Sequence, residues 1–265
     1  MKLPSLLAAL ALPALAAFTV QAQTVTLVHQ FDFTTDAASR VGGLTTATGT
    51  LSGGASISGG SLHLTGDAWV DLAPVVPVAG DYNASTWTVS IWARSLMPAG
   101  QTGELLSQGA YTGYLPDFDL GLSTNADGSA GAFARNRSGW GGGASGSVAD
   151  AGGWNLYTTV MSHFGAVLYV NGVFQGSGGN SMYPCCYTSQ TARIGRAVAN
   201  FGGQFAGEID DVRIYTGSLS QSAIMAQYAA GPSAVSAVPE PEPAPMLMLG
   251  LGGLALWLQR RRIPR

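Results

Sequence analysis

The chain has 265 residues, of which 37 are glycine and only 10% are charged. Low charge with many glycines is typical of an all-β domain rich in tight turns, and this length suits one large β-sandwich. Between residues 23 and 238 the sequence contains seven Arg, no Lys and thirteen Asp or Glu. This acidic balance excludes the nucleic-acid-binding class, which depends on basic contacts with phosphates.

The first 22 residues predict a signal peptide. Lys2 precedes an apolar run from Leu6 to Val20, and the segment closes with Ala22 where signal peptidase requires a small residue. We expect cleavage after Ala22 and export of the rest of the chain. The alternative, a transmembrane anchor, is disfavoured because the apolar stretch is short and contains Pro13.

Alternating apolar and polar residues predict antiparallel strands in the body. In Leu62-His63-Leu64 and in residues 86 to 91 (TWTVSI), large apolar side chains recur at every second position. We therefore expect one face of each strand to be buried, with Trp87 in the core, and the other face to contact solvent.

Two further elements follow along the chain. The Asn171-Gly172 pair between two apolar runs predicts a hairpin, because both residues tolerate the positive φ angles of a type I′ turn. Near the end of the body, Val212 and Ile214 are expected on one strand face, opposite Asp211, Arg213 and Tyr215. Residues 219 to 228 predict the one helix of the domain, with Ser218 or Ser220 as N-cap and with Ile224 and Tyr228 on one face.

The C-terminal segment has three parts. Pro239-Glu240-Pro241 is followed by an apolar run from Met246 to Leu258 and then by the basic residues Arg260, Arg261 and Arg262. This order resembles the PEP-CTERM sorting signal, which implies processing by an exosortase in a Gram-negative bacterium that makes extracellular polysaccharide. The prolines keep the first part extended, the apolar part enters the bilayer and the arginines remain on the cytoplasmic side.

The apolar run is shorter than the roughly 20 residues of a spanning helix. We therefore expect a transient membrane segment that is cut near Pro-Glu-Pro, and a permanent anchor is the alternative. The body would then leave an inner-membrane intermediate for the cell surface or the extracellular matrix.

An ordered series of segments resembles the LamG-like, or concanavalin A-like, jelly-roll family. The segments are Phe31-Asp32-Phe33, LHLTGDAWVDL (62–72), WTVSIWAR (87–94), ELLSQ (104–108), FDLGL (118–122), residues 154–174, Arg193-Ile194-Gly195-Arg196 and FAGEIDDVRIY (205–215). The resemblance implies two antiparallel sheets packed face to face, closed by one short C-terminal helix. The expected organisation is a signal peptide (1–22), a jelly-roll domain (23–230), a proline-rich linker (231–245) and a membrane segment with a basic tail (246–265).

Catalysis is not expected. Glucanases of this superfamily use two carboxylic acids spaced as Glu-x-Asp-x-x-Glu, and Glu208-Ile209-Asp210 begins this pattern without a second Glu. The other glutamate of the body, Glu104, is distant in sequence, and His29, His63 and His163 have no zinc-site spacing. A polysaccharide hydrolase with an aspartate pair is the remaining enzymatic alternative.

A calcium site and a disulfide are the other candidate features. Rim loops of the family often carry Ca²⁺, and Asp32 and Asp210 are the candidate ligands. The alternative is that Asp210 and Asp211 cap backbone amides or pair with Arg213. Cys185 and Cys186 are adjacent, so in an oxidising compartment they form a strained vicinal disulfide, stay as free thiols or bond to another chain.

Sugar binding depends on aromatic faces, because pyranose rings present apolar C–H edges. The candidates are Trp140 in a glycine-rich loop, Tyr111 and Tyr114, and Tyr183 and Tyr187 beside the cysteines. The alternative role of these side chains is to cover the sheet edges. We expect an exported, carbohydrate-binding protein that recognises extracellular polysaccharide, and the alternative is a structural or adhesive matrix protein that binds other proteins.

Overall fold

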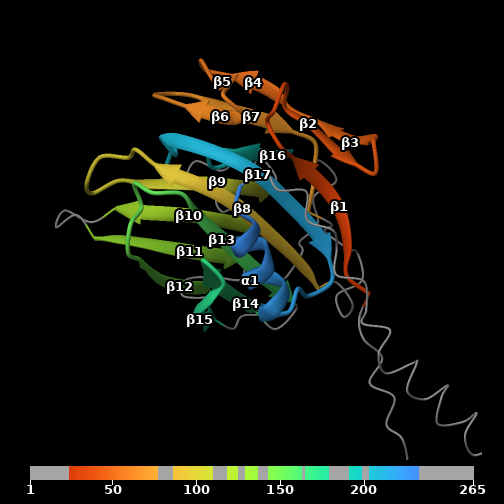
Figure 1. Cartoon of the computed structure of the whole chain (residues 1–265). Helices are drawn as coiled ribbons and strands as arrows, with labels where there is room; N and C mark the ends of the chain where they lie inside the picture. The colour runs from red at the N-terminus through yellow and green to blue at the C-terminus, as the bar shows by residue number, and fades with distance from the viewer. Residues whose placement is uncertain are drawn as a thin grey trace, which may run out of the picture.

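Two antiparallel β-sheets and one helix make up the described part of the chain (Figure 1), which comprises residues 24–76, 86–109, 118–124, 129–136, 143–162, 165–178, 191–198 and 203–232 of the computed structural model. In the ten-stranded sheet eight strands follow the order β15-β14-β13-β8-β17-β1-β2-β3, and β6 joins β17 and carries β5. The seven-stranded sheet follows the order β12-β11-β10-β9-β16-β7-β4. This arrangement confirms the predicted all-β, two-sheet fold.

The bounds of the elements are as follows. The ten-stranded sheet contains β1 (Thr26–Phe31), β2 (Ala38–Val41), β3 (Leu44–Thr48), β5 (Ser56–Ser58), β6 (Ser61–Leu64), β8 (Trp87–Ser95), β13 (Asn155–Ser162), β14 (Gly165–Val170), β15 (Val173–Gly178) and β17 (Gly207–Thr216). The seven-stranded sheet contains β4 (Thr50–Ser52), β7 (Trp69–Leu72), β9 (Thr102–Gly109), β10 (Phe118–Thr124), β11 (Ala130–Asn136), β12 (Gly143–Val148) and β16 (Thr191–Ile194). The helix is α1 (Gln221–Ala230).

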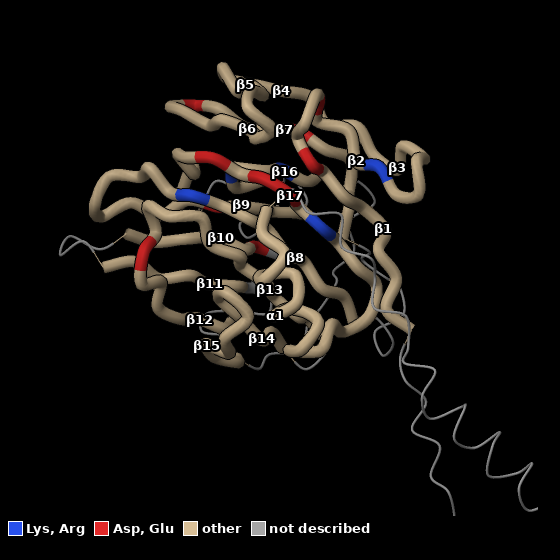
Figure 2. Tube along the Cα trace, in the orientation of Figure 1, with Lys and Arg blue, Asp and Glu red and all other residues tan. Residues whose placement is uncertain are grey.

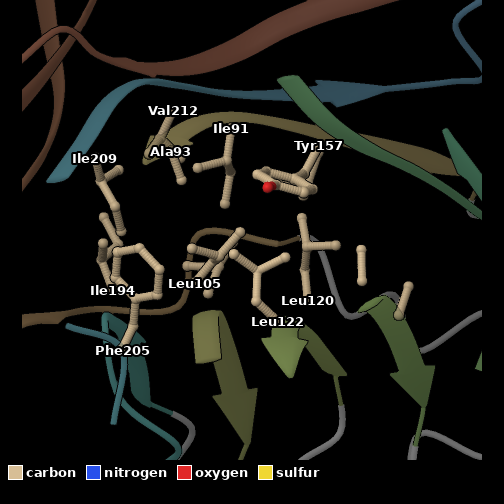
Figure 3. Packing of buried hydrophobic residues seen from close by; sticks show 14 of the residues in the cluster. Ile91, Ala93, Leu105, Leu120, Leu122, Tyr157, Ile194, Phe205, Ile209 and Val212 are labelled. Carbon is tan, nitrogen blue, oxygen red and sulfur yellow. The ribbon is translucent and has the colours of Figure 1, made fainter. Parts of the chain in front are cut away.

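The main core lies between the two sheets. Ile91, Tyr157 and Val212 of the ten-stranded sheet point toward Leu120 and Leu122 of the seven-stranded sheet, and all five are fully buried (Figure 3). Each fully buried side chain of this size stabilises the fold by about 2 kcal/mol. The two-residue alternation read from the sequence therefore generates the apolar layer that holds the sheets together.

A second, smaller core covers the outer face of the ten-stranded sheet. The helix α1 contributes Ile224, which packs with Trp92, Leu156 and Tyr215. Tyr228 of the same helix stacks on Trp92 with ring centroids 5.7 Å apart. The residues of both cores lie between Val25 and Ile224, so the body contains its own hydrophobic interior.

This second core corrects one expectation. The polar residues of β8 were expected to face solvent, but Thr88 is 0% exposed and Ser90 is 1% exposed. Thr88 Oγ1 donates to the Gly217 carbonyl at 2.8 Å and accepts from the Leu219 amide at 3.1 Å. The connection from β17 to α1 folds over this face, which the two-residue period alone does not reveal.

The local predictions for the hairpin and the helix are confirmed. Asn171 and Gly172 have φ angles of 54° and 77° and join β14 to β15. Ser220 is the N-cap of α1, with its side chain accepting from the Ala223 amide at 3.3 Å. Within the described ranges no helix is both long and apolar enough to cross a membrane. The predicted signal peptide and sorting tail lie outside these ranges.

Candidate functional site

Most of the predicted site residues lie outside the described part of the chain. These are the aromatic candidates Trp140, Tyr111, Tyr114, Tyr183 and Tyr187, the cysteines Cys185 and Cys186, and the sorting residues Pro239, Glu240, Pro241, Arg260, Arg261 and Arg262. Their roles stay predictions.

The two candidate calcium ligands have separate surroundings. Asp32 Oδ1 accepts hydrogen bonds from the Thr34 amide at 3.1 Å and from Thr34 Oγ1 at 2.6 Å, which closes a tight turn. Asp210 is buried on β17, opposite Trp92 of β8. Among the described residues, no three His, Cys, Asp or Glu side chains gather closely enough to hold a metal ion. The calcium site therefore remains a prediction.

The neighbouring Asp211 forms a buried ion pair with Arg213. Its Oδ1 accepts from Arg213 Nε at 2.8 Å and from Gln30 Nε2 at 2.9 Å, at a bulge where Asp211 has a φ angle of 49°. Burial raises the pKa of the Asp211 carboxyl, although its bonds to Arg213 oppose that shift. The bond from Gln30 joins β17 to β1, and the ion pair agrees with the alternative that an acid of this segment pairs with Arg213.

Glu208, the first residue of the incomplete catalytic pattern on β17, also pairs with other side chains of the fold. Glu208 forms an ion pair with Arg94 of β8, and His63 Nδ1 lies 3.7 Å from its Oε1. The Arg94 guanidinium lies 5.7 Å from the ring centroid of Trp154. Figure 2 shows this mixture of charges, with acidic and basic positions beside one another on β17 and β8. Glu208 thus links β17 to β8 through Arg94 and lies beside His63 of β6.

The seven-stranded sheet brings together two carboxylates that the sequence separates. Asp119 pairs in register with Ser107, and Gly121, two residues further along β10, pairs with Glu104 of β9. Both acids lie on the outer face of the sheet, because Leu120 and Leu122 occupy the core side. Glu104 is 0% exposed and Asp119 is 2% exposed, and each is engaged in an interaction with the chain. Their burial denies a polysaccharide access to them.

A cluster of polar and aromatic residues lies on the same outer face, at β4, β7 and β16. In β7, Val70 and Leu72 are buried in the core, so Trp69 and Asp71 point outward. In β16, Ala192 and Ile194 are buried and Arg193 points outward, directly opposite Asp71. We call Trp69, Asp71, Arg193 and Arg196 the Trp69 cluster.

Asp71 is the centre of this cluster. Its Oδ1 accepts from Arg193 Nε at 2.8 Å, and its Oδ2 accepts from Trp69 Nε1 at 2.7 Å and from Ser52 Oγ at 3.1 Å. Partial burial alone would raise the pKa of Asp71, but these donors outweigh burial and hold the pKa below its ordinary value. The indole and the guanidinium of Arg193 are therefore fixed by one ionised carboxylate.

Arg196 completes the cluster from the following turn. Its guanidinium carbon lies 4.5 Å from the Trp69 ring centroid, and that of Arg193 lies 5.7 Å away. Gly195, with a φ angle of 86°, reverses the chain between the two arginines. The Val198 amide then donates to Ser107 Oγ at 3.1 Å, which fastens the turn to β9.

Sequence reasoning did not identify the Trp69 cluster. Its segments, 62–72 and 193–196, were recognised only as parts of the family pattern. More than a hundred residues separate them, and their contact depends on the pairing of β7 with β16. The available signal was the alternation in Trp69-Val70-Asp71-Leu72, which places an aromatic ring and an acid on one face.

The comparison with protein families decides the assignment of the fold. The Laminin_G_3 model, described as the concanavalin A-like lectin/glucanases superfamily, matches residues 64–225. The chain belongs to the concanavalin A-like lectin/glucanases superfamily. This result confirms the resemblance of the body to the concanavalin A-like jelly-roll family. No curated protein matches the chain.

Solved structures share this superfamily fold at low sequence identity. Domain 4 of AbnA, a GH43 extracellular arabinanase from Geobacillus stearothermophilus in complex with arabinotriose, has a TM-score of 0.54 and 20% identity, covering 77% of this chain and 98% of that domain. The binding domain of botulinum neurotoxin DC in complex with SialylT has a TM-score of 0.54 and 12% identity, and the match covers 77% of this chain and 51% of the toxin chain. A structure of botulinum neurotoxin type C, whose cell entry depends upon two ganglioside molecules, has a TM-score of 0.57 and 11% identity. The match covers 77% of this chain and 50% of the toxin chain. The chain spans about half the length of the toxin structures, and these identities show the fold alone.

The ion pair within the Trp69 cluster gives a stability prediction for the lectin-like domain. Arg193→Met should lower the free energy of unfolding at pH 7 by about 1 kcal/mol, because it removes a charge-assisted donor from a half-buried carboxylate. The lowered pKa of Asp71 means that this contribution exists above the ordinary pKa of 3.8 and is lost as the pH falls through the folded value. Denaturant unfolding at a series of pH values measures both effects.

Arg40→Met is the matched control for this experiment. Arg40 pairs with Asp36, but the two side chains are 40% and 48% exposed, so the substitution should change stability less than Arg193→Met does. Equal losses in the two variants, or a loss in Arg193→Met that does not shrink as the pH falls below 3.8, would contradict the role assigned to Asp71.

Proposed function

We propose that the chain is an exported protein whose lectin-like domain binds extracellular polysaccharide through the seven-stranded sheet. The binding surface would combine one end of that sheet with its outer face, including the Trp69 cluster. The observation that carries this proposal is the position of the strand ends from which the predicted aromatic segments leave the sheet.

These strand ends lie together. Gly109 at the end of β9 pairs in register with Thr191 at the start of β16. At the same end of the sheet, Phe118 of β10 pairs with Asn136 of β11, and Gly143 of β12 pairs with the residue before Asn136. Three segments adjoin these strand ends: residues 110–117, 137–142 and 179–190. Together they contain all five aromatic candidates. Three aromatic segments separated in sequence are thus attached at one end of one sheet.

The other sheet is a poorer candidate for sugar binding. Its outer face carries the second core, in which α1 covers Trp92, Leu156 and Tyr215. In contrast, the outer face of the seven-stranded sheet carries Trp69 and Arg196, which are partly exposed. A ligand therefore has polar and aromatic partners on the seven-stranded side.

The similar structures support a sugar-binding role for this fold. The AbnA domain was solved with arabinotriose, the neurotoxin DC domain with SialylT, and neurotoxin type C is described as dependent upon two gangliosides. The AbnA domain is a separate domain of a hydrolase, which fits a binding role better than a catalytic one. The burial of Glu104 and Asp119 also argues against hydrolysis by this chain.

Export and surface location are part of the proposal. The signal peptide before Gln23 would direct the chain across the inner membrane, and the segment from Pro239 to Arg262 would hold it there until an exosortase cut near Pro-Glu-Pro. A mature protein released in this way would reach the cell surface or the matrix, where extracellular polysaccharide is present.

One observation favours a second function, adhesion to other proteins. Val173, Phe174 and Met225 are 59%, 51% and 55% exposed, and the hairpin that carries the first two contacts α1 beside Met225. Clustered apolar residues on a surface often mark protein contacts. This patch lies on the ten-stranded side, away from the proposed sugar-binding surface.

A glycan array on the purified body, residues 23–238, tests the proposed function. The wild-type body should bind at least one polysaccharide, and Trp140→Ala should weaken that binding by at least about tenfold through loss of stacking. Phe174→Ala is the matched control, because it removes an exposed aromatic from the other sheet and should leave glycan binding unchanged. Absence of glycan binding, or a loss in the control equal to that in Trp140→Ala, would refute the proposed site.

The processing step has its own test. Glu240→Ala in the full chain, expressed in the native host, should accumulate as an uncleaved form in the inner membrane. Immunoblots of membrane, surface and culture fractions report the size and location of the protein. Processing and release that match the wild type would count against the sorting signal.

A further inference from the structure

Two guanidinium groups contact Trp69, but only one of them has an acidic partner in the described part of the chain. Arg193 donates to Asp71, which also accepts hydrogen bonds from Trp69 and Ser52. Arg196 forms no ion pair with any described carboxylate, and its side chain contacts the indole ring of Trp69. The cluster therefore carries one uncompensated positive charge on a body with an excess of acidic residues.

The backbone fixes the position of Arg196. The Gly195 amide donates to the Leu105 carbonyl at 3.1 Å, and Arg196 forms a β-bridge with Gln204. The two residues that follow, Ala197 and Val198, are only 4% and 2% exposed. A side chain that starts from such a rigid turn and stacks on an indole loses little conformational freedom when it binds a ligand.

The stacking of Arg196 decides which kind of sugar fits here. Its guanidinium covers a face of Trp69, which is then not available to the apolar edge of a neutral pyranose. A stacked guanidinium still presents its in-plane N–H groups, and these match the two oxygens of a carboxylate or a sulfate. The geometry therefore favours an oxyanion over a neutral ring.

We infer that Arg196, supported by Trp69, is a subsite for an anionic sugar residue, with a carboxylate or a sulfate as the group that it binds. This inference rests on the proposed polysaccharide binding and adds the chemical class of the ligand. Asp71 and Arg193 act as positioning residues, because they hold the indole on which Arg196 stacks.

The test compares pairs of polymers that share a sugar backbone, of which one member carries an anionic group and the other does not. Binding of the body to polygalacturonate is measured against fully methyl-esterified polygalacturonate, and binding to dextran sulfate against dextran, by calorimetry at low salt. We expect one charged polymer to bind at least about tenfold more tightly than its neutral partner, and the preferred pair identifies a carboxylate or a sulfate. The preference should weaken as the salt concentration rises.

Substitutions link the preference to Arg196. Arg196→Gln should abolish the preference for the charged polymer, whereas Arg196→Lys should retain part of it. Arg40→Gln, which removes an exposed arginine at β2, is the charge-matched control and should keep the full preference. The thermal unfolding midpoint of each variant shows whether the domain remains folded.

The outcomes separate this inference from the function on which it rests. If neutral glycans on the array bind and depend on Trp140 while neither charged polymer is preferred, the anionic subsite is wrong and the proposed function stands. A charge preference that survives in folded Arg196→Gln also overturns the assignment to Arg196. Failure of every glycan to bind overturns both proposals.

Discussion

The burial of one apolar layer between two β-sheets is the constraint on which the rest of the structure depends. Ile91 and Val212 on one side and Leu120 on the other exclude water completely. Since side chains alternate along a strand, the same packing determines which residues point outward. The core thus fixes the positions of Trp69 and Asp71 as firmly as it fixes those of Val70 and Leu72.

The outer faces of the two sheets differ in what covers them. On the ten-stranded sheet, α1 adds a second core, and buried polar residues of that sheet, such as Thr88 and Asp211, are used in hydrogen bonds and ion pairs within the fold. On the seven-stranded sheet, Trp69 and Arg196 remain partly exposed on the outer face. We therefore propose recognition on the face that the helix does not cover.

Local patterns predicted the elements well because their causes are local. The Asn171-Gly172 turn and the Ser220 cap depend on the conformational preferences of those residues, and the core positions of Trp87 and Val212 depend on alternation. The solvent exposure of Thr88 was predicted wrongly because the segment that covers it, with Gly217 and Leu219, lies more than a hundred residues away in sequence.

The candidate site was less accessible to prediction, because it depends on contacts between distant segments. The pairing of Asp71 with Arg193 and the stacking of Arg196 on Trp69 follow from the register of β7 and β16, which no spacing in the sequence records. The proximity of Glu104 and Asp119 has the same origin. Residue types such as Trp140 could still be proposed from composition, since aromatic side chains in glycine-rich loops are suited to sugars.

Side-chain footprinting tests most directly whether the seven-stranded sheet is the recognition surface. Hydroxyl-radical labelling of residues 23–238, with and without a bound polysaccharide, is read by mass spectrometry at Trp69, Trp140, Phe174 and Met225. The account predicts that the ligand shields Trp69 and Trp140 and leaves Phe174 and Met225 as reactive as before. Shielding of Phe174 and Met225 with no change at either tryptophan would contradict it.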